Sequence, residues 1–363
     1  MPGRMPDGEG LPLDLQRWLR NTIMVLGVAA LLAATLAGRT SLGTIGSGVG
    51  TLTLSHRGTV METGFQHPLS AQYWAYGGSA PPAIRYATWS PGQLAVGVDN
   101  RGHRTYYGYF AVTRNTAPAN SYVQAVVAPM TATPGRHQTA ETVVAVQTAW
   151  TKLTGLINYV VVSELSHDGR PKRLFAGYAH GYLAHASTVS YYSKHVAKIL
   201  NGTGPYVVTI RTDGYKMAQI WIGNHLIVAR SDLHLNIQPP FQVYLEVQDV
   251  DMRYAAVFYH MSVYTARTVE VAGLPSGAHL SFASGGRIWR ETADSKGNVR
   301  LAFSVPELSN VGTMTISAGG HRWVFPALHL AGGDHLRFGH LPPVLEWLRY
   351  IPSAPWLSQP IPT

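Results

Sequence analysis

Tyrosine and histidine side chains are concentrated between residues 174 and 195, which read LFAGYAHGYLAHASTVSYYSKH. In a β-strand, successive side chains point to opposite faces of the sheet. Tyr178, His180 and Tyr182 would therefore share one face, opposite small apolar residues. His180 and His185 are separated by an odd number of positions, so a metal ion bound by both would require a bend in the strand. The pattern favours a polar aromatic strand face over a metal site.

Two further segments show the same alternation. In QVYLEVQ, the side chains of Tyr244, Glu246 and Gln248 alternate with aliphatic residues. In TYYGYFAVT, Tyr107 and Tyr109 are predicted to lie opposite the apolar residues of that segment. Aromatic rings pack against the C–H faces of sugars, and carboxylate, amide and imidazole groups hydrogen-bond to hydroxyl groups. We therefore expect one ligand-binding face, formed by Tyr107, Tyr109, Tyr178, His180, Tyr182, Tyr244, Glu246 and Gln248.

Two alternatives to this glycan-binding face stay open. The tyrosines are strong β-formers, so the face could simply be solvated or covered by a neighbouring domain. A protein could also be the ligand in place of a glycan.

The composition of the 363-residue chain excludes several classes of chemistry. There is no cysteine, which excludes disulfide bonds, thiol catalysis and zinc sites built on cysteine. The formal net charge is +9, but the sequence contains no run of Lys and Arg and no recognition helix, so we do not expect nucleic-acid binding. The sequence also lacks the G-x-S-x-G elbow, the phosphate-binding loop and the dinucleotide fingerprint.

Residues 21–38, NTIMVLGVAALLAATLAG, are uncharged and just long enough to span a bilayer as a helix. Arg17 and Arg20 precede them, which favours a cytoplasmic segment at residues 1–20 and an exported remainder. The helix is expected to be a retained membrane anchor or a cleaved signal peptide, with a buried helix as a third possibility. The protein would then lie at the cell surface, or be secreted after cleavage. A Gly/Ser-rich stretch at 39–50 is expected to be a flexible linker.

Residues 51–266 are dominated by short apolar runs separated by turn dipeptides such as Asp213-Gly214, a pattern typical of all-β folds. The ordered segments GFQHPLSAQYWAYGG, WSPGQLAVGVDNRG, SYVQAVVAPM, TVVAVQTA and NYVVVSEL resemble the first half of a concanavalin A-like, laminin-G-like jelly roll. The segments PYVVTIRTDGYKMAQIWIGNHLIVAR, PFQVYLEVQ and AAVFYHMSVY resemble its closing strands. The resemblance implies a jelly-roll sandwich of the concanavalin A-like lectin/glucanase superfamily.

The remainder of the chain is expected to form a second, smaller unit and an arm. Residues 267–330 resemble an immunoglobulin-like β-sandwich, because short strands alternate with Gly-rich turns. Residues 331–363 are rich in proline, which argues for an extended arm. Apolar residues of the arm, such as Trp347 and Trp356, are expected to dock on the same chain or to mediate self-association.

The resembled superfamily contains glycoside hydrolases as well as lectins. Its hydrolases carry two glutamates in an E-x-D-x-x-E arrangement, so that a nucleophile and an acid flank one glycosidic bond. The nearest match, LEVQDVD, departs from this pattern, because Glu246 is an odd number of positions from both Asp249 and Asp251 and would face away from them. Glu164, on another strand, is the remaining partner for Glu246 in a hydrolase. By the same resemblance, Asp249 and Asp251 share a face and could help to hold calcium, although a solvated strand end is the simpler expectation.

These observations favour a noncatalytic extracellular protein that recognises a glycan or a cell-envelope polymer, with no cofactor other than calcium. One alternative is a structural surface protein that self-assembles through its C-terminal arm. The other is a glycoside hydrolase that acts on a polysaccharide.

Overall fold

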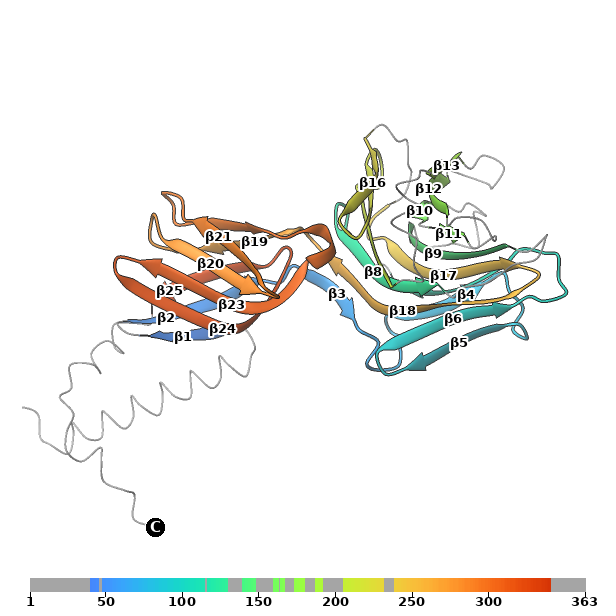
Figure 1. Cartoon of the computed structure of the whole chain (residues 1–363), viewed down its shortest axis with the longest axis horizontal. Helices are drawn as coiled ribbons and strands as arrows, with labels where there is room; N and C mark the ends of the chain where they lie inside the picture. Colours follow the sequence, from blue (N-terminus) through green and yellow to red (C-terminus); the bar gives the residue numbers. More distant parts are fainter. Residues whose placement is uncertain are drawn as a thin grey trace, which may run out of the picture.

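The fold is built from β-strands. In the computed structural model, the described residues are 40–45, 48–114, 116–129, 139–147, 159–162, 164–166, 173–179, 187–191, 205–231 and 238–340. Within these ranges the only helical element is the 3-10 turn η2 (Val305–Glu307), so the predicted all-β class is confirmed (Figure 1). No helix within them is long and apolar enough to cross a membrane, and the segment predicted to do so, 21–38, lies outside them.

The larger unit is a sandwich of two antiparallel sheets, as the resemblance to a jelly roll implied. Sheet I has the order β10-β12-β11-β9-β17-β7-β4, with β13 paired to β12, and sheet II has the order β16-β15-β14-β8-β18-β6-β5, with β3 paired to β18. The strands of sheet I are β4 (Trp74–Gly78), β7 (Tyr107–Thr113), β9 (Thr139–Gln147), β10 (Tyr159–Val162), β11 (Glu164–Ser166), β12 (Arg173–Ala179), β13 (Ser187–Tyr191) and β17 (Gln242–Val250). Those of sheet II are β3 (Thr59–Thr63), β5 (Arg85–Ser90), β6 (Gln93–Asp99), β8 (Tyr122–Pro129), β14 (Tyr206–Thr212), β15 (Ala218–Ile222), β16 (His225–Arg230) and β18 (Arg253–Tyr264).

The core of this sandwich lies between the two sheets and follows from the period-two pattern of the strands. In β17, Val243, Leu245 and Val247 point inward and are fully buried. They face sheet II, whose inward side chains include Val96 and Phe258, also fully buried. Burying each such side chain contributes about 1.5–3 kcal/mol. The alternation thus fixes which face of β17 is core and which face points outward.

The smaller unit is a second two-sheet sandwich. Its first sheet has the order β1-β2-β25-β19-β22 and its second sheet the order β21-β20-β23-β24. The strands are β1 (Thr40–Ile45), β2 (Gly48–His56), β19 (Thr268–Ala272), β20 (His279–Ser284), β21 (Arg287–Thr292), β22 (Val299–Ala302), β23 (Ser309–Ala318), β24 (His321–Ala331) and β25 (His335–His340). Leu52, Phe282 and Phe325 are among the buried residues between the sheets. The immunoglobulin-like character of this sandwich stays a prediction.

Two predicted boundaries are wrong. The stretch 39–50 is not a linker, because 40–45 and 48–50 belong to strands β1 and β2, and β2 pairs along β25. The arm does not begin at residue 331, because β25 extends to His340. Glycines concealed these strands: Gly50 packs so closely that a Cβ there would lie 2.8 Å from the Trp323 ring. The second sandwich is therefore built from both sides of the chain, and the jelly roll is inserted between β2 and β19.

The chain leaves the second sandwich after β2 and returns to it before β19, and these two crossings meet at one tightly packed junction. A Cβ on Gly58 would lie 2.3 Å from the carbonyl oxygen of Gly332, so neither backbone tolerates a side chain there. The buried carboxylate of Asp334 accepts hydrogen bonds from the N–H of Gly58 at 2.7 Å and from the N–H of Ala331 at 2.8 Å. The N–H of Thr265, on the returning crossing, donates to the carbonyl of Gly58 at 2.9 Å. Asp334 therefore ties the outgoing crossing to the β24–β25 turn.

A second contact joins the sandwiches beside η2. The side-chain amide of Gln124, on the outer face of sheet II, donates to the carbonyl of Val305 at 2.9 Å. Tyr122, Trp221 and Tyr264 from the jelly roll belong to the buried cluster of the second sandwich. The two sandwiches thus share a buried contact as well as two chain crossings.

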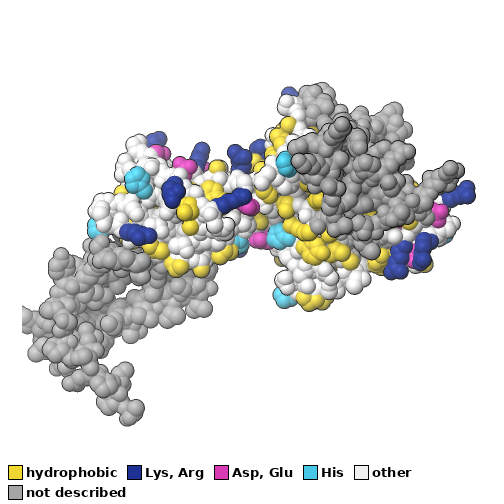
Figure 2. All heavy atoms as spheres, viewed as in Figure 1, with side chains coloured by type: hydrophobic (Ala, Val, Ile, Leu, Met, Phe, Trp, Pro, Cys, Tyr) yellow, Lys and Arg dark blue, Asp and Glu magenta, His cyan; other side chains and the backbone are white. Residues whose placement is uncertain are grey.

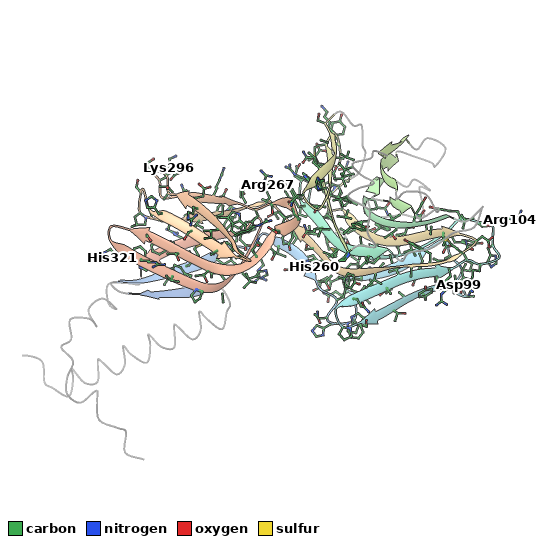
Figure 3. All side chains as sticks on the ribbon, viewed as in Figure 1. Asp99, Arg104, His260, Arg267, Lys296 and His321 are labelled. Atoms are coloured by element: carbon green, nitrogen blue, oxygen red, sulfur yellow. The ribbon has the colours of Figure 1, made fainter. Side chains whose placement is uncertain are left out.

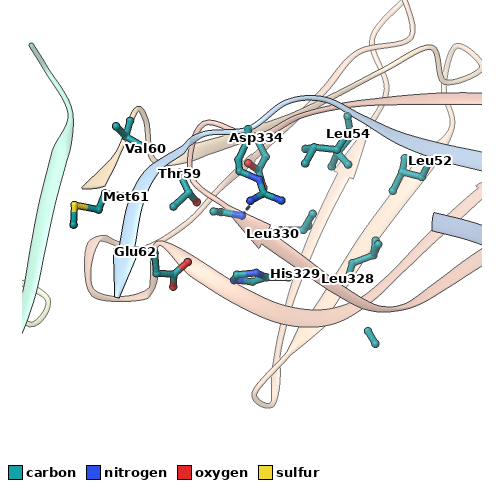
Figure 4. A pocket seen from close by; sticks show the side chains of 14 residues that line it. Leu52, Leu54, Thr59, Val60, Met61, Glu62, Leu328, His329, Leu330 and Asp334 are labelled. Atoms are coloured by element: carbon teal, nitrogen blue, oxygen red, sulfur yellow. Dashed lines mark hydrogen bonds between the residues drawn. The ribbon is translucent and has the colours of Figure 1, made fainter. Parts of the chain in front are cut away.

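A cavity of about 580 Å³ opens beside the junction (Figure 4). Its floor is apolar and includes Leu54 and Leu330, while Asp334 also lines it. Glu62 and His329 lie close together at its rim in Figure 4. Asp334 therefore lines this cavity in addition to joining the chain segments at the junction.

We expect Asp334→Ala to lower the free energy of unfolding by about 2–4 kcal/mol, because two buried N–H groups would lose their acceptor. Urea denaturation followed by tryptophan fluorescence measures this change. Glu291→Ala, at an exposed position of β21, is the control and should stay within about 0.5 kcal/mol of the parent protein. If both variants unfold at the same urea concentration, Asp334 does not hold the junction.

Candidate functional site on the outer face of sheet I

The outward face of β17 carries the candidate site. Directly paired residues of neighbouring strands point to the same face of a sheet. Glu246 is paired with Phe110 of β7 on one side and with Val143 of β9 on the other. Gln248 is paired with Gly108 of β7 and with Glu141 of β9. Glu246 and Gln248 of β17 and Glu141 of β9 therefore form one polar cluster on two adjacent strands.

One half of this face is apolar and buried. The rings of Phe110 and Tyr244 meet edge to face, with their centroids 4.8 Å apart. Tyr244, Val112, Val143 and Ala145 form a small buried cluster that is separate from the core between the sheets. This cluster anchors the side chains that stand next to the polar half.

The polar half is organised around Gln248. Its side-chain amide donates a 2.8 Å hydrogen bond to Oε1 of Glu246. The Tyr106 hydroxyl, on the exposed loop before β7, donates to the carboxylate of Glu141. Gly108 makes room for this arrangement, because a Cβ there would lie 2.6 Å from Oε1 of Glu246. A flat ring, an amide and two carboxyl groups are thus available side by side.

Burial raises the pKa of the Glu246 carboxyl from its usual value of about 4.5 to about 7. The hydrogen bond from Gln248 opposes this shift, and the negative charge of Glu141 adds to it. Near neutral pH, Glu246 can therefore either donate or accept a proton in a hydrogen bond. Such a group can bind a sugar hydroxyl. Its pKa near neutrality is also what a general acid needs.

The structure divides the predicted ligand-binding residues into three sets. Tyr244, Glu246 and Gln248 share one outward face, in the phase that the alternation predicts. The placement of Tyr107 and Tyr109 on this face is wrong. Tyr109 is buried in the main core, where it stacks on Tyr76 and lies under the Arg85 guanidinium. Tyr107 packs against the same core.

The error on β7 has a physical reason. Its sequence, YGYFAVT, carries apolar residues at both odd and even positions, so composition alone does not reveal which set points inward. Pairing with β17 decides the phase: Phe110 lies opposite Glu246 on the outward face. The tyrosines of β7 therefore point inward.

The third set is not placed by the structure. Tyr178 lies in β12 and Glu164 in β11, but the description of these strands does not extend to their side chains. His180 and Tyr182 lie outside the described residues. Their roles in ligand binding, and that of Glu164 in hydrolysis, stay predictions.

Glu141 is the residue that sequence reasoning missed. The segment TAETVVAVQ reads equally as a helix or as a strand, and nothing in it indicates which residue of β17 lies opposite Glu141. Only the register, which pairs Glu141 with Gln248, brings it to the site.

The two aspartates predicted to share a strand face do not do so. Asp249 points inward from β17 and is fully buried, whereas Asp251 follows the end of β17 with a positive φ of 52°. Within the described residues, no group of three or more His, Asp or Glu side chains is placed to hold a metal ion.

Comparison with known proteins gives only distant similarity. No protein-family model matches the chain, and no curated protein matches it. A glycosyl hydrolase family protein from Mycobacterium fortuitum is similar over 57% of this chain and 99% of its own, with 16% sequence identity and a TM-score of 0.37. An Emp46p carbohydrate recognition domain is similar over 58% of this chain and 97% of its own, with 7% identity and a TM-score of 0.38. Values this low do not assign a family or an activity.

The raised pKa of Glu246 predicts a pH dependence of stability. Because the folded protein holds this proton up to about pH 7, and an unfolded glutamate loses it near 4.5, the free energy of unfolding falls as pH rises between these values. We expect Glu246→Gln to remove on the order of 1–3 kcal/mol of that fall. Urea denaturation at a series of pH values measures it. Glu291→Gln, at an exposed position, is the control. Identical pH profiles for the parent and Glu246→Gln would contradict the raised pKa.

Proposed function

We propose that this protein binds a glycan or a cell-envelope polysaccharide on the outer face of sheet I and does not cleave it. The observation that carries the proposal is the polar cluster of Glu141, Glu246 and Gln248 beside the exposed ring of Tyr106. A sugar ring can pack its C–H face on such a tyrosine while its hydroxyls exchange hydrogen bonds with the amide and carboxyl groups. Paired strands hold these groups in fixed positions, which keeps the entropic cost of binding low.

The proposal includes a location at the cell exterior. It is supported by the uncharged segment 21–38 and by the arginines that precede it, which favour export of the remainder of the chain. Membrane contact through this segment and self-association through the C-terminal arm belong to the same proposal. The structural alternative, a self-assembling surface protein, depends on the arm rather than on the face of sheet I.

Glycoside hydrolysis is the second candidate, and one observation favours it. Glu246 has a raised pKa, and Glu141 stands on the neighbouring strand of the same face. A carboxyl group of raised pKa beside a second carboxyl group is the arrangement from which glycosidases form a general acid and a nucleophile. The polar cluster offers no second acid in the E-x-D-x-x-E arrangement, so noncatalytic binding is the better supported function.

Binding is tested with a glycan and polysaccharide array probed by the full-length protein. We expect Gln248→Ala and Tyr106→Ala each to weaken binding by about tenfold, which corresponds to the loss of one good contact. Tyr215→Ala is the matched control, because Tyr215 is also an exposed tyrosine and lies on the β14–β15 turn of sheet II. Binding that is unchanged in both site variants, or absent for every glycan, would contradict the proposal.

Hydrolysis is tested on any polysaccharide that the array identifies. We expect the parent protein to release no new reducing ends from it. If reducing ends appear, and Glu246→Gln abolishes them while it retains binding, the protein is a glycoside hydrolase and Glu246 is a catalytic residue.

A further inference from the structure

The outward face of the first sheet of the second sandwich carries a groove that is separate from the candidate glycan site. Its volume is about 840 Å³, and it lies over β19, between β25 on one side and β22 on the other. Its floor is low, because β19 ends in Ala272 and is followed by Gly273. Gly273 has a φ of 81°, and a Cβ there would lie 2.5 Å from the carbonyl oxygen of Phe338, so the backbone requires glycine. The open floor is therefore part of the fold.

Cationic side chains stand on both sides of this groove. Arg337 of β25 is paired with Ala272, and Arg300 of β22 is paired with Glu270. Paired residues of neighbouring strands point to the same face of a sheet. Val271, the residue of β19 between the two pairs, is fully buried in the core of the sandwich. Both arginines therefore point outward from opposite sides of β19, and both are exposed.

A third cation, Lys296, lines the groove from the turn that precedes β22. The carboxylate of Asp294 holds this turn, because it accepts hydrogen bonds from the N–H of Lys296 at 2.8 Å and from that of Asn298 at 2.9 Å. The N–H of Leu274, just after β19, donates to the carbonyl of Gly297 at 3.0 Å and ties the turn to the strand end. Figure 3 labels Lys296 at the upper edge of the second sandwich, and Figure 2 shows further Lys and Arg side chains along this edge. The backbone that carries Lys296 is thus held in place by the fold itself.

The acid nearest the floor of the groove is already engaged. One carboxylate oxygen of Glu270 lies 2.9 Å from the guanidinium of Arg300, and the other lies 3.4 Å from Nδ1 of His335. Neither Lys296 nor Arg337 forms an ion pair with an acid of the described residues. The side chain of Arg300 is 75% exposed, and its fork of five N–H groups exceeds what one carboxylate oxygen can use. All three cations therefore keep donors for a ligand.

We propose that this groove binds an anionic polysaccharide, whose carboxylate or phosphate groups pair with Lys296, Arg300 and Arg337. Guanidinium and ammonium groups form their strongest hydrogen bonds with such anions. Ser55 also lines the groove, and its hydroxyl can accept a hydrogen bond from a sugar hydroxyl. The site is a second interaction surface, on the other sandwich, and it does not depend on the outer face of sheet I.

The lining favours a sparsely charged glycan over other anionic partners. The described residues that line the groove include no Phe, Tyr or Trp, the side chains that anchor protein partners and stack on single-stranded nucleic acids. A nucleic-acid duplex carries one charge per about 1.7 Å of its axis, and Glu270 and Asp294 would repel part of so dense an array. A polysaccharide with spaced acidic groups can place these beside the cations and its hydroxyls beside the two carboxylates. The mixture of three cations and two acids thus selects against dense polyanions.

The site is tested by biolayer interferometry of the full-length protein on immobilised polygalacturonate, on a phosphomannan and on neutral dextran. We expect at least one of the two acidic polymers to bind at low salt, which identifies the acidic group, and dextran not to bind this groove. Binding should weaken as salt is added, because salt screens exposed charges. The double substitution Lys296→Gln and Arg337→Gln should weaken binding by about tenfold. The control, Arg290→Gln with Arg322→Gln, removes the same charge from exposed positions of the other sheet and should bind like the parent protein.

The proposal is overturned if neither acidic polysaccharide binds, or if both double variants lose binding equally, which would show attraction by net charge alone. Tighter binding of polyglutamate or of duplex DNA than of either polysaccharide would also overturn it, because the groove would then select another class of polymer. Gln248→Ala, which tests the candidate glycan site, should leave this binding unchanged. Loss in Gln248→Ala with retention in the Lys296 and Arg337 double variant would place the acidic polymer on sheet I. Failure of this groove and failure of the proposed function are therefore distinguishable.

Discussion

The structure depends on strand β17, because one of its faces belongs to the core and the other carries the candidate site. Its odd-numbered side chains, such as Leu245, are buried between the two sheets, and its even-numbered ones, such as Glu246, point outward. A slip of one residue would exchange the two sets and place Glu246 among the core residues. Pairing along β7 on one side and β9 on the other prevents this slip. The hydrophobic energy of the core therefore also fixes the orientation of the candidate site.

The second sandwich constrains the jelly roll because the chain builds it before and after the insertion. Both crossings pass through the junction at Gly58 and Thr265, where no side chain fits between the backbones. The contact between Gln124 and Val305 lies apart from this junction. Rotation of one sandwich against the other would break buried hydrogen bonds at two places, which is costly. The candidate face is thus carried on a fixed frame rather than on a hinged domain.

The sequence predicts the parts of this arrangement that depend on strong alternation. The all-β class and the outward phase of Tyr244, Glu246 and Gln248 follow from one strand read alone. The inward phase of Tyr109 does not, because both faces of its strand are apolar and only pairing distinguishes them. The role of Glu141 depends on register, which is a property of two strands. Strand β2 was concealed by glycine, and Gly50 serves close packing against the Trp323 ring rather than flexibility.

Glu246 and Asp249 show how one strand can separate two kinds of chemistry. Burial raises the pKa of both carboxyl groups to about 7, yet their surroundings differ. Glu246 receives a hydrogen bond from Gln248 and stands beside Glu141, so a ligand with hydroxyl groups can share its proton. Asp249 is enclosed between the sheets, where burial raises the pKa of its carboxyl and a side-chain hydrogen bond from Asn100 opposes the shift. The two carboxyl groups, three positions apart on β17, therefore stand in separate environments on opposite faces of the sheet.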